Sequence, residues 1–435
     1  MWECVELSAI CRLSNDIPTS WNKPMRKSRA GARRVARLRV TRTTVGASRG
    51  HDASVMPRRR TAIFRRQDVK IERVEAIPFR IPLKKASRWG AHGKRDAQDH
   101  VLIRIYADGV VGTAEAPARP TIYGETQRSI VHIVRDVLGP MLVGRDALDR
   151  EGYQAALAAI PWNPTAKAAL DTALHDVAAQ SLKVSLARLL GGSVKPVEVS
   201  WMLSLNFDND EEFVQEALKV RDQYGIQAFK IKAGADPAGD IQRLRMLREA
   251  LGDQALLFID ANQLYTPDVA IRTINAMAEY GLAMAEEPVA VGLGAYRKKV
   301  ADATSVPILA DDSVFSLTDV RRELQDGAIG VMGIKIARTG MYESTRIVHM
   351  AEGYGLPCWI GSQGVSGVGA VASAHFAAAF RAVTYPADLS TPLKQEDDLL
   401  ARPIDIRDGK LHVLDAPGIG AEVDPDKLAR YRLDW

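Results

Sequence analysis

Hydrophobic and polar positions follow two different patterns along the chain. Between residues 69 and 192, alternating segments such as "IERVEAIPFRIPL" and "HVLIRIYADGVVGTAEA" predict strands joined by polar turns, because strand side chains point alternately to two faces. Helical periodicity follows in "TQRSIVHIVRDVLGPML" and in "PTAKAALDTALHDVAAQSLKVSLARLLGG", a stretch that ends at a Gly-Gly stop. Strands followed by helices predict an α+β capping domain over residues 69–192.

Residues 193–384 show a repeated alternation of short apolar runs and amphipathic helical segments. Taking one residue at the end of each run, from the second run on, gives steps of 30, 26, 25, 24 and 26 residues; these residues are Lys230, Asp260, Glu286, Asp311, Lys335 and Gly361. One strand, one helix and two loops fit such a step, so we predict an α/β fold with a (β/α)7β TIM-like barrel. A doubly wound sheet has a similar repeat, but it does not readily gather ionisable residues from five successive strand ends.

The two ends of the chain lie outside this repeat. Residues 385–435 have strand and turn signals and are predicted to return to the capping domain. Residues 1–66 hold 16 Lys and Arg against 4 Asp and Glu, a net charge of +12, which leaves −7 for the rest of a chain whose net charge is +5. We predict a disordered basic tail over residues 1–68, with an Arg-rich transit peptide or a translation start at Met56 as alternatives.

Composition narrows the classes of function. The 435 residues are 46% hydrophobic and 26% charged, which is ordinary for a globular protein, and no apolar run reaches the ~18 residues of a membrane span. The basic excess is confined to the tail, so we expect neither a nucleic-acid nor a membrane partner. Cys4, Cys11 and Cys358 have no metal-ligand spacing and fit a reducing cytoplasm.

Ionisable residues end five successive predicted strands, where barrel enzymes place their sites. Three acids that converge there would repel one another without a cation, and ligation by carboxylates alone favours Mg²⁺ or Mn²⁺. Lysines precede and follow the acids, which suits a metal that holds a substrate carboxylate while a lysine moves the proton on the neighbouring carbon. In strand order the residues are Lys230, Lys232, Asp260, Asn262, Glu286 or Glu287, Asp311 or Asp312, and Lys335.

The motifs "KIK", "DAN", "EEP", "ADD" and "KIA", in this order and at barrel spacing, resemble the muconate lactonizing enzyme subgroup of the enolase superfamily. The resemblance covers nearly all of residues 69–435. Within the subgroup, "EAPARPTIYGET", "NPTAKAALD", "IKIARTG" and "PGIGAEVDPDKLARYR" are similar to the anti-type muconate cycloisomerases. The mandelate racemase subgroup would need a histidine after strand seven, and none is present there.

The resemblance implies roles for the strand-end residues. Asp260, Glu286 and Asp311 are then the Mg²⁺ ligands, with Mn²⁺ as an alternative ion, and Glu286 is chosen over Glu287 because the family pattern is ligand, then Glu or Gln, then proline. Asn262 is then a polar neighbour of the metal.

The same resemblance makes Lys232 and Lys335 the acid/base pair. Lys230 is then a modulator, expected to lower the proton affinity of Lys232.

Candidate substrate contacts come from the capping loops and from the loop after strand seven. The glycine-rich "GSQGVSGVG" either offers helix N-terminal amides to a substrate carboxylate or serves close packing. Trp201 either lines the pocket or fills the barrel. The other candidates are Asn262, Gln363, Arg119, Tyr123, Trp89 and His92.

Several reactions use one such site. The first expectation is a Mg²⁺-dependent isomerase that converts cis,cis-muconate to muconolactone, with Lys335 as the proton donor. Racemisation or epimerisation of N-acylamino acids or dipeptides is the alternative, and a dehydratase or an o-succinylbenzoate-type synthase is also compatible. In each case we expect a cytoplasmic homo-oligomer that acts on a small-molecule carboxylate.

Overall fold

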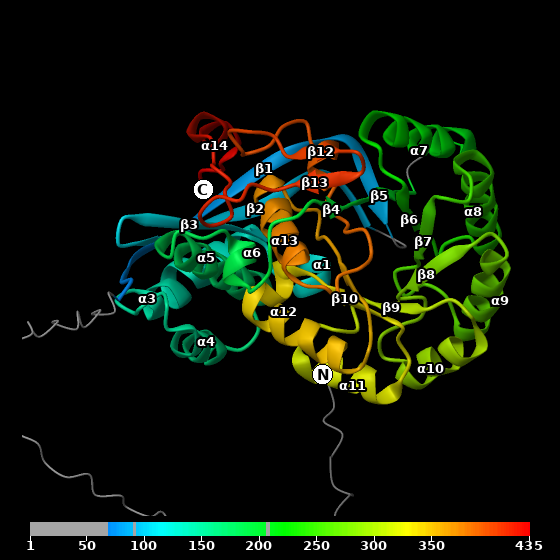
Figure 1. The fold of residues 1–435 in the computed structure, drawn as a ribbon, viewed down its shortest axis with the longest axis horizontal. Coiled ribbons are helices and arrows are strands. Elements are labelled where there is room, and N and C mark those ends of the chain that lie inside the picture. Colours follow the sequence, from blue (N-terminus) through cyan, green and yellow to red (C-terminus); the bar gives the residue numbers. More distant parts are fainter. Residues whose placement is uncertain (1–67, 90–92, 206–208) are drawn as a thin grey trace, which may run out of the picture. The chain divides into compact units, whose positions relative to one another are not determined.

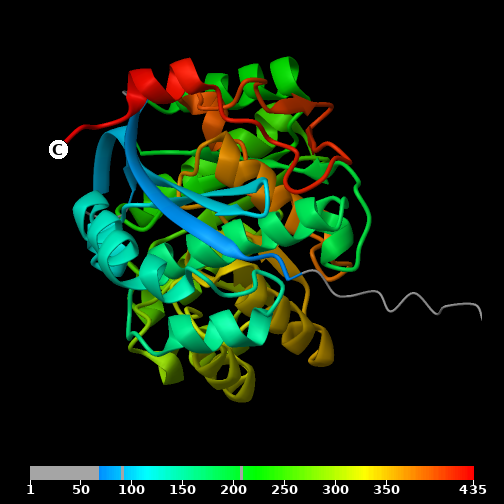
Figure 2. The same ribbon diagram turned by 90° about the vertical axis from the view of Figure 1, so that its left-hand side faces the viewer.

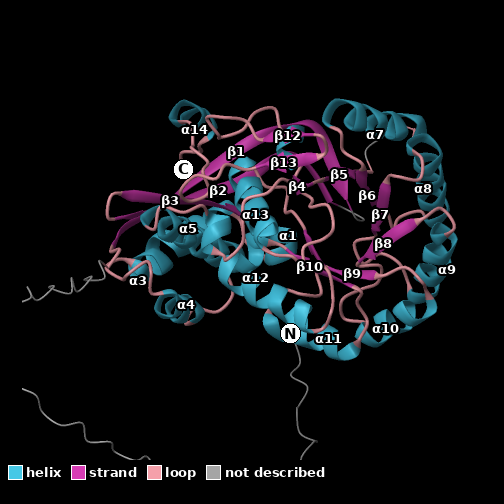
Figure 3. Cartoon of the chain, viewed as in Figure 1, coloured by secondary structure: helices cyan, strands magenta, loops and turns pink. Residues whose placement is uncertain are grey.

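The computed structural model describes residues 68–89, 93–205 and 209–435. The capping domain is a three-stranded antiparallel sheet, ordered β1-β2-β3, with helices packed on it (Figures 1 and 3). Its buried residues form a hydrophobic core of their own, to which the sheet and α5 contribute. Its elements are β1 (Ile71–Trp89), β2 (Gly93–Ala107), β3 (Val110–Pro117), α1 (Pro120–Tyr123), α2 (Gln127–Ile133), the π-helical turn η1 (Val134–Leu138), α3 (Gly139–Leu142), α4 (Arg150–Ala158), α5 (Pro164–Ser181) and α6 (Leu186–Leu189).

Seven parallel strands form the second sheet, and neighbours in space are also neighbours in sequence, from β5 to β11. Each strand is followed by a helix, and these helices lie on the outside of the curved sheet (Figure 1). The elements of this part of the chain are β4 (Val197–Glu198), which lies outside the seven-stranded sheet, β5 (Ser200–Leu203), α7 (Asp210–Tyr224), β6 (Ala228–Lys232), α8 (Pro237–Leu251), β7 (Leu256–Asp260), α9 (Pro267–Ala278), β8 (Leu282–Glu286), α10 (Gly294–Ala303), β9 (Ile308–Ala310), α11 (Leu317–Asp326), β10 (Val331–Ile334), α12 (Ile336–Gly353), β11 (Cys358–Ile360) and α13 (Gly367–Ala379).

Residues 382–388 run between the two outer strands of this sheet. Val383 forms a parallel bridge with Cys358 of β11, and Ala387 forms one with Val199, beside β5. The amide of Ser200 also donates to the carbonyl of Ala387 at 2.8 Å. This extended segment therefore joins β11 to β5, and the predicted barrel with its capping domain is confirmed.

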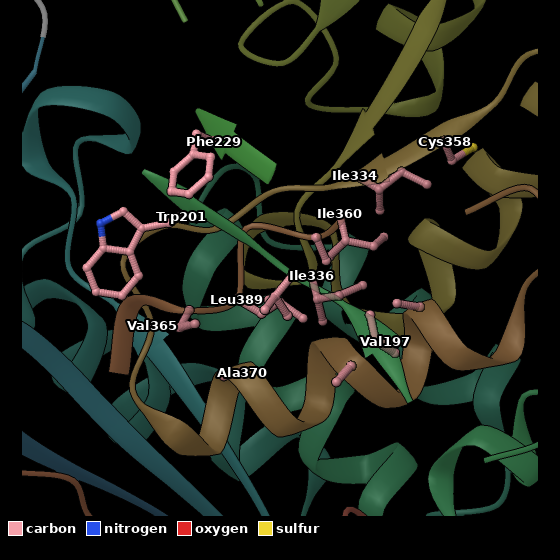
Figure 4. Packing of buried hydrophobic residues seen from close by; sticks show 14 of the residues in the cluster. Val197, Trp201, Phe229, Ile334, Ile336, Cys358, Ile360, Val365, Ala370 and Leu389 are labelled. Carbon is pink, nitrogen blue, oxygen red and sulfur yellow. The ribbon is translucent and has the colours of Figure 1, made fainter. Parts of the chain in front are cut away.

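The strand register creates layers inside the barrel. Residues two positions before the predicted acids point to the same inner side, because strand side chains alternate. These residues are Phe258, Met284 and Leu309. Together with Val331 and Trp359 from the next two strands, they form a fully buried apolar layer beneath the ionisable row. A larger core lies around the barrel strands, and it includes Val197 of β4, Ile360 of β11 and Ala370 of α13 (Figure 4).

The last part of the chain packs back on the capping domain. It contains the 3₁₀ turn η2 (Thr391–Lys394), the hairpin β12 (Asp405–Arg407) and β13 (Lys410–His412), and α14 (Pro425–Tyr431). Both η2 and α14 contact β1, and β13 pairs with β4 (Figures 1 and 2). The extended segment and η2 therefore bring C-terminal residues to the mouth of the barrel.

One predicted helical stretch is wrong in detail. The run predicted to be helical up to the Gly-Gly stop is two helices, because α5 ends at Ser181 and Lys183 has a φ of 56°. The amide of Gly418 donates to the carbonyl of Val184 at 2.9 Å, and the amide of Leu186 donates to the carbonyl of Gly418 at 2.8 Å. A contact from the other end of the chain thus occupies the backbone groups between the two helices.

Two further predictions concern the basic tail and membrane-spanning helices. The basic tail lies outside the described residues. Within the described ranges, no helix is both long and apolar enough to cross a bilayer.

Candidate active site

A cavity of about 480 Å³ opens at the carboxyl ends of the barrel strands, beneath the capping domain. Eight of the ten predicted site residues line it. Glu286 and Tyr123 do not line the cavity but contact residues that do. The eight lining residues are Lys230, Lys232, Asp260, Asn262, Asp311, Lys335, Gln363 and Arg119.

Lys230 lies at the centre of the ionisable row and is 2% exposed. Its Nζ is 2.9 Å from Glu286 Oε2 and 3.4 Å from both Asp260 Oδ2 and Asp388 Oδ2. It also lies 4.6 Å from the centre of the Trp359 ring. Burial by itself would lower the pKa of Lys230, but these three carboxylates raise it well above its ordinary value.

Lys232 and Lys335 lie at opposite ends of the acidic row. Lys232 donates to Asp260 Oδ2 at 2.5 Å and to Asn262 Oδ1 at 2.9 Å. The ammonium of Lys335 contacts the carboxylate of Asp311. Both lysines therefore face one cavity from the two ends of this row.

The three predicted metal ligands, Asp260, Glu286 and Asp311, come from adjacent strand ends. Burial and the charges of Asp260 and Asp311 raise the pKa of Glu286 well above its ordinary value. Although burial opposes it, Lys232 and Lys230 lower the pKa of Asp260, and Lys335 and Arg338 lower that of Asp311. These shifts indicate converging acids that a cation would stabilise.

Whether a divalent ion fits can be judged from the carboxylates themselves. Oε1 of Glu286 is buried and accepts no hydrogen bond from a described residue, and the donor set consists of oxygens, which Mg²⁺ and Mn²⁺ prefer. In the described part of the chain, no three His, Cys, Asp or Glu side chains form a ready-made coordination sphere, and lysine ammoniums contact these acids directly. The residue types therefore fit a divalent ion that would share the carboxylates with the lysines.

Glu287 and Asp312, the second acids of "EEP" and "ADD" after Glu286 and Asp311, have surroundings of their own. Glu287 accepts from the amide of Asp311 at 2.7 Å and from the amide and hydroxyl of Ser313, and it lies 3.4 Å from Arg297. Burial raises the pKa of Glu287 to about 7. Glu287 thus holds the backbone that carries Asp311. Asp312 lines the cavity and accepts from Gln263 at 3.0 Å.

Arg338 and Asp388 also belong to the site, although neither was predicted from the sequence. Arg338 is 4% exposed and donates to Asp311 Oδ1 at 2.9 Å and to the carbonyl of Asp311 at 2.8 Å. Asp388 lines the cavity beside Lys230. Asp388 follows Gly361 by 27 residues, so one more step of the barrel repeat would have found it. Arg338 lies one helical turn after Lys335, within the motif "IKIARTG", but the motif by itself does not indicate what Arg338 contacts.

Predicted substrate contacts on the cap and in the loop after strand seven form hydrogen bonds within the protein. Arg119 donates to the carbonyl of Ala118 at 2.7 Å and to Gln98 Oε1 at 3.2 Å. Gln363 donates to the Tyr123 hydroxyl at 2.6 Å, which joins barrel and cap.

The amides at the start of α13 are occupied. Those of Ser366 and Gly367 donate to Glu115 at 2.8 Å and to Asp398 at 3.1 Å. These two amides therefore bind the protein's own carboxylates, which favours the packing interpretation of the glycine-rich loop.

The indole of Trp201 is 7% exposed and packs in the large core, where its Nε1 donates to Glu216 Oε1 at 2.7 Å (Figure 4). Trp201 thus supports the pocket without lining it. His92 and the side chain of Trp89 lie outside the described residues.

A (β/α)7β barrel beneath an α+β cap, with lysines and acids from successive strand ends facing one cavity, defines an enzyme of the enolase superfamily. Comparison with protein families agrees. Residues 73–191 match the mandelate racemase/muconate lactonizing enzyme N-terminal domain, and residues 212–427 match the enolase C-terminal domain-like family.

Individual relatives support the same assignment. The muconate lactonizing enzyme of Mycobacterium smegmatis, solved with muconolactone, is 40% identical; the match covers 84% of this chain and all of that one, with a TM-score of 0.81. The L-Ala-D/L-Glu epimerase of Bacillus subtilis is 34% identical over 81% of this chain and 96% of its own. The chloromuconate cycloisomerase CbnB of Cupriavidus necator is 31% identical over 77% of this chain and 91% of its own.

The chain belongs to the mandelate racemase/muconate lactonizing enzyme family of the enolase superfamily. It is an enzyme of the isomerase class, to which the cycloisomerases and epimerases among its relatives belong. Enzymes of this family generally depend on a divalent metal.

Proposed function

We propose that the protein is a Mg²⁺-dependent cycloisomerase that converts cis,cis-muconate to muconolactone. The observation that carries the proposal is the placement of Lys232 and Lys335 at the two ends of one acidic row, both facing the same cavity. The relatives named muconate and chloromuconate cycloisomerases supply the substrate.

The reaction needs one carboxylate of muconate to add to the double bond that is conjugated with the other carboxylate. Negative charge then develops on the second carboxylate and its α-carbon, and a proton must reach that carbon. A divalent ion held by Asp260, Glu286 and Asp311 would supply positive charge next to this carboxylate. Lys335 donates the proton, while Lys230 and Lys232 add positive charge on the other side of the acids.

Proton NMR in D₂O with Mg²⁺ tests the proposal. Conversion of cis,cis-muconate to muconolactone with one deuterium per molecule is the expected result. In Lys335→Ala the conversion should stop, because the proton donor is gone. Lys232→Ala should keep a measurable rate, because Lys232 does not deliver the proton. Equal rates for both variants and the wild type would contradict the assignment of Lys335.

Epimerisation of a dipeptide is the second candidate, favoured by the relative named L-Ala-D/L-Glu epimerase. Two lysines on opposite sides of one carbon suit removal of a proton on one face and its return on the other. The same NMR experiment with L-Ala-L-Glu separates the candidates, because epimerisation exchanges the α-proton for deuterium. Inert muconate together with this exchange would replace the first proposal.

We also infer that the enzyme is cytoplasmic, acts on a small-molecule carboxylate and forms a homo-oligomer. Light scattering of the purified full chain tests the assembly, and a monomer would contradict it.

A further inference from the structure

Lys394 also lines this cavity and has no role in the proposed reaction. It ends η2, in the segment that returns to the cap. Lys84 Nζ donates to the carbonyl of Leu393 at 3.0 Å, and the amide of Glu396 donates to the carbonyl of Pro82 at 2.9 Å. Contacts on both sides of Lys394 therefore fix its backbone against β1.

The ammonium of Lys394 is positioned by β5. It donates to the carbonyl of Met202 and lies 4.3 Å from the centre of the Trp201 ring. The Trp201 ring is held in turn by its bond to Glu216. Because Met202 is the register partner of Lys230, Lys394 lies next to the strand end that carries Lys230 and Lys232.

Lys394 differs in its counter-charges from the three lysines that contact the acidic row. Lys230, Lys232 and Lys335 each form an ion pair with a carboxylate. Among the described residues, no aspartate or glutamate forms an ion pair with Lys394, whose polar contact is a main-chain carbonyl. Burial lowers its pKa to about 8. The charges of Glu216 and Asp388 favour the ammonium without forming an ion pair with it, and burial outweighs them. An anionic ligand group in direct contact would offset this cost of burial.

The charge of the whole cavity points the same way. Seven lysines and arginines line it, against four aspartates. Although lysines contact some of these aspartates, cationic side chains outnumber anionic ones in the lining, so the cavity has a net positive charge. The cationic residues are Lys85, Arg95, Arg119, Lys230, Lys232, Lys335 and Lys394, and the anionic ones are Asp260, Asp311, Asp312 and Asp388.

We propose that Lys394 binds the second acidic group of the substrate, the one remote from the acidic row, and thereby selects dicarboxylates over monocarboxylates. The inference rests on the proposed function only for placing the first carboxylate near the acidic row. Arg119, which lies on the cap and donates to Ala118 and Gln98, is the competing anchor for the same group.

Calorimetric titration with unreactive ligands tests this inference. Adipate carries two carboxylates, and its monomethyl ester carries one on a chain of similar length. A charge-assisted hydrogen bond in a buried site corresponds to a preference of about tenfold to a hundredfold. With Mg²⁺ present, the wild-type enzyme should bind adipate more tightly than the monoester by about that factor.

The variants assign the preference to a residue. Lys394→Met should bind both ligands equally, Lys394→Arg should keep part of the preference, and Arg119→Met should keep most of it. If Lys394→Met does not fold, Lys394→Gln gives the same comparison, with circular dichroism as the check on folding. A preference that survives in Lys394→Met, that disappears in Arg119→Met alone, or that is absent from the wild type overturns the inference.

This test is independent of muconate turnover. If the wild-type enzyme leaves muconate unchanged but prefers adipate through Lys394, the proposed function fails and the dicarboxylate site stands. If muconate is converted and Lys394→Met retains the preference, the site assignment fails and the proposed function stands.

Discussion

Gly361, the residue directly after β11, should be required for the position of Lys335. A Cβ at residue 361 would lie 2.6 Å from Cζ3 of Trp359 and 2.7 Å from Cε of Lys335. Carbon atoms prefer separations of about 3.5–4.0 Å, so Gly361→Ala leaves a shortfall of about 1 Å. Trp359 is fully buried and its Nε1 donates to the carbonyl of Pro386 at 3.0 Å. The tryptophan cannot withdraw, so Lys335 must move away from Asp311.

The expected magnitude follows from this displacement. Overpacking of a filled site costs about 1–3 kcal/mol of unfolding free energy, and misplacing a reacting group by about 1 Å can cost about a hundredfold in rate. We expect Gly361→Ala to fold, to lose that amount of stability and to lose about a hundredfold in kcat. Urea denaturation measures the first quantity, and the loss of muconate absorbance measures the second.

Gly353 provides the matched control. It is the last residue of α12, and a Cβ there would meet no atom within 4 Å. Gly353→Ala should keep full activity and leave the unfolding free energy unchanged or raised by about 0.5 kcal/mol. Activity of folded Gly361→Ala within twofold of the wild type would refute the reasoning, because Lys335 would then tolerate a different position.

Three other predictions address the metal, the acidic row and the cap. Treatment with a chelator should abolish turnover and lower the melting temperature, and added Mg²⁺ should restore both. In Asp311→Asn the melting temperature should no longer respond to Mg²⁺. Turnover that survives chelation would exclude a metal requirement. Arg338→Met should lower the unfolding free energy by about 3 kcal/mol, because it leaves part of a buried ion pair unmatched. Arg135→Met, which removes an exposed pair with Asp136, should change it little. Similar losses for the two variants in urea denaturation would contradict this. Burial raises the pKa of Asp176 from 3.8 to about 6 in the folded protein. The contribution of this group to the unfolding free energy is complete below about pH 4, where its carboxyl is protonated in the folded and unfolded states. As the pH rises to 6, the unfolded state loses its proton first, and the unfolding free energy falls by about 3 kcal/mol. Asp176→Asn should lack this loss, and stability curves of wild type and variant that run parallel from pH 4 to pH 6 would disprove the effect.

The barrel could be predicted because its repeat is local. Each strand and the helix after it span about 25 residues, and each strand is buried on both sides, so the apolar runs and their spacing are visible in the sequence. The row from Lys230 to Lys335 follows directly, since parallel strands end at the same edge. The next step of the repeat, from Gly361 to Asp388, was not predicted because Asp388 ends a short extended segment without a strong apolar run.

The break between α5 and α6 depends on a contact with Gly418, more than 230 residues away in sequence. Local periodicity continues through this break, so only the fold could reveal it. The same holds for the amides at the start of α13, which bind Glu115 of β3 and Asp398 of the C-terminal segment.

The sequence by itself determined the architecture and the kinds of residues at the strand ends, because hydrophobic periodicity and strand spacing act over short distances along the chain. Tertiary structure alone decided which charges meet. It paired Lys230 with Asp388, placed Arg338 on Asp311 and brought Lys394 to the cavity, where no aspartate or glutamate of the described ranges forms an ion pair with it. The physical reason is that ion pairing depends on distances of a few ångströms between side chains, and folding sets those distances between residues that are far apart in the chain.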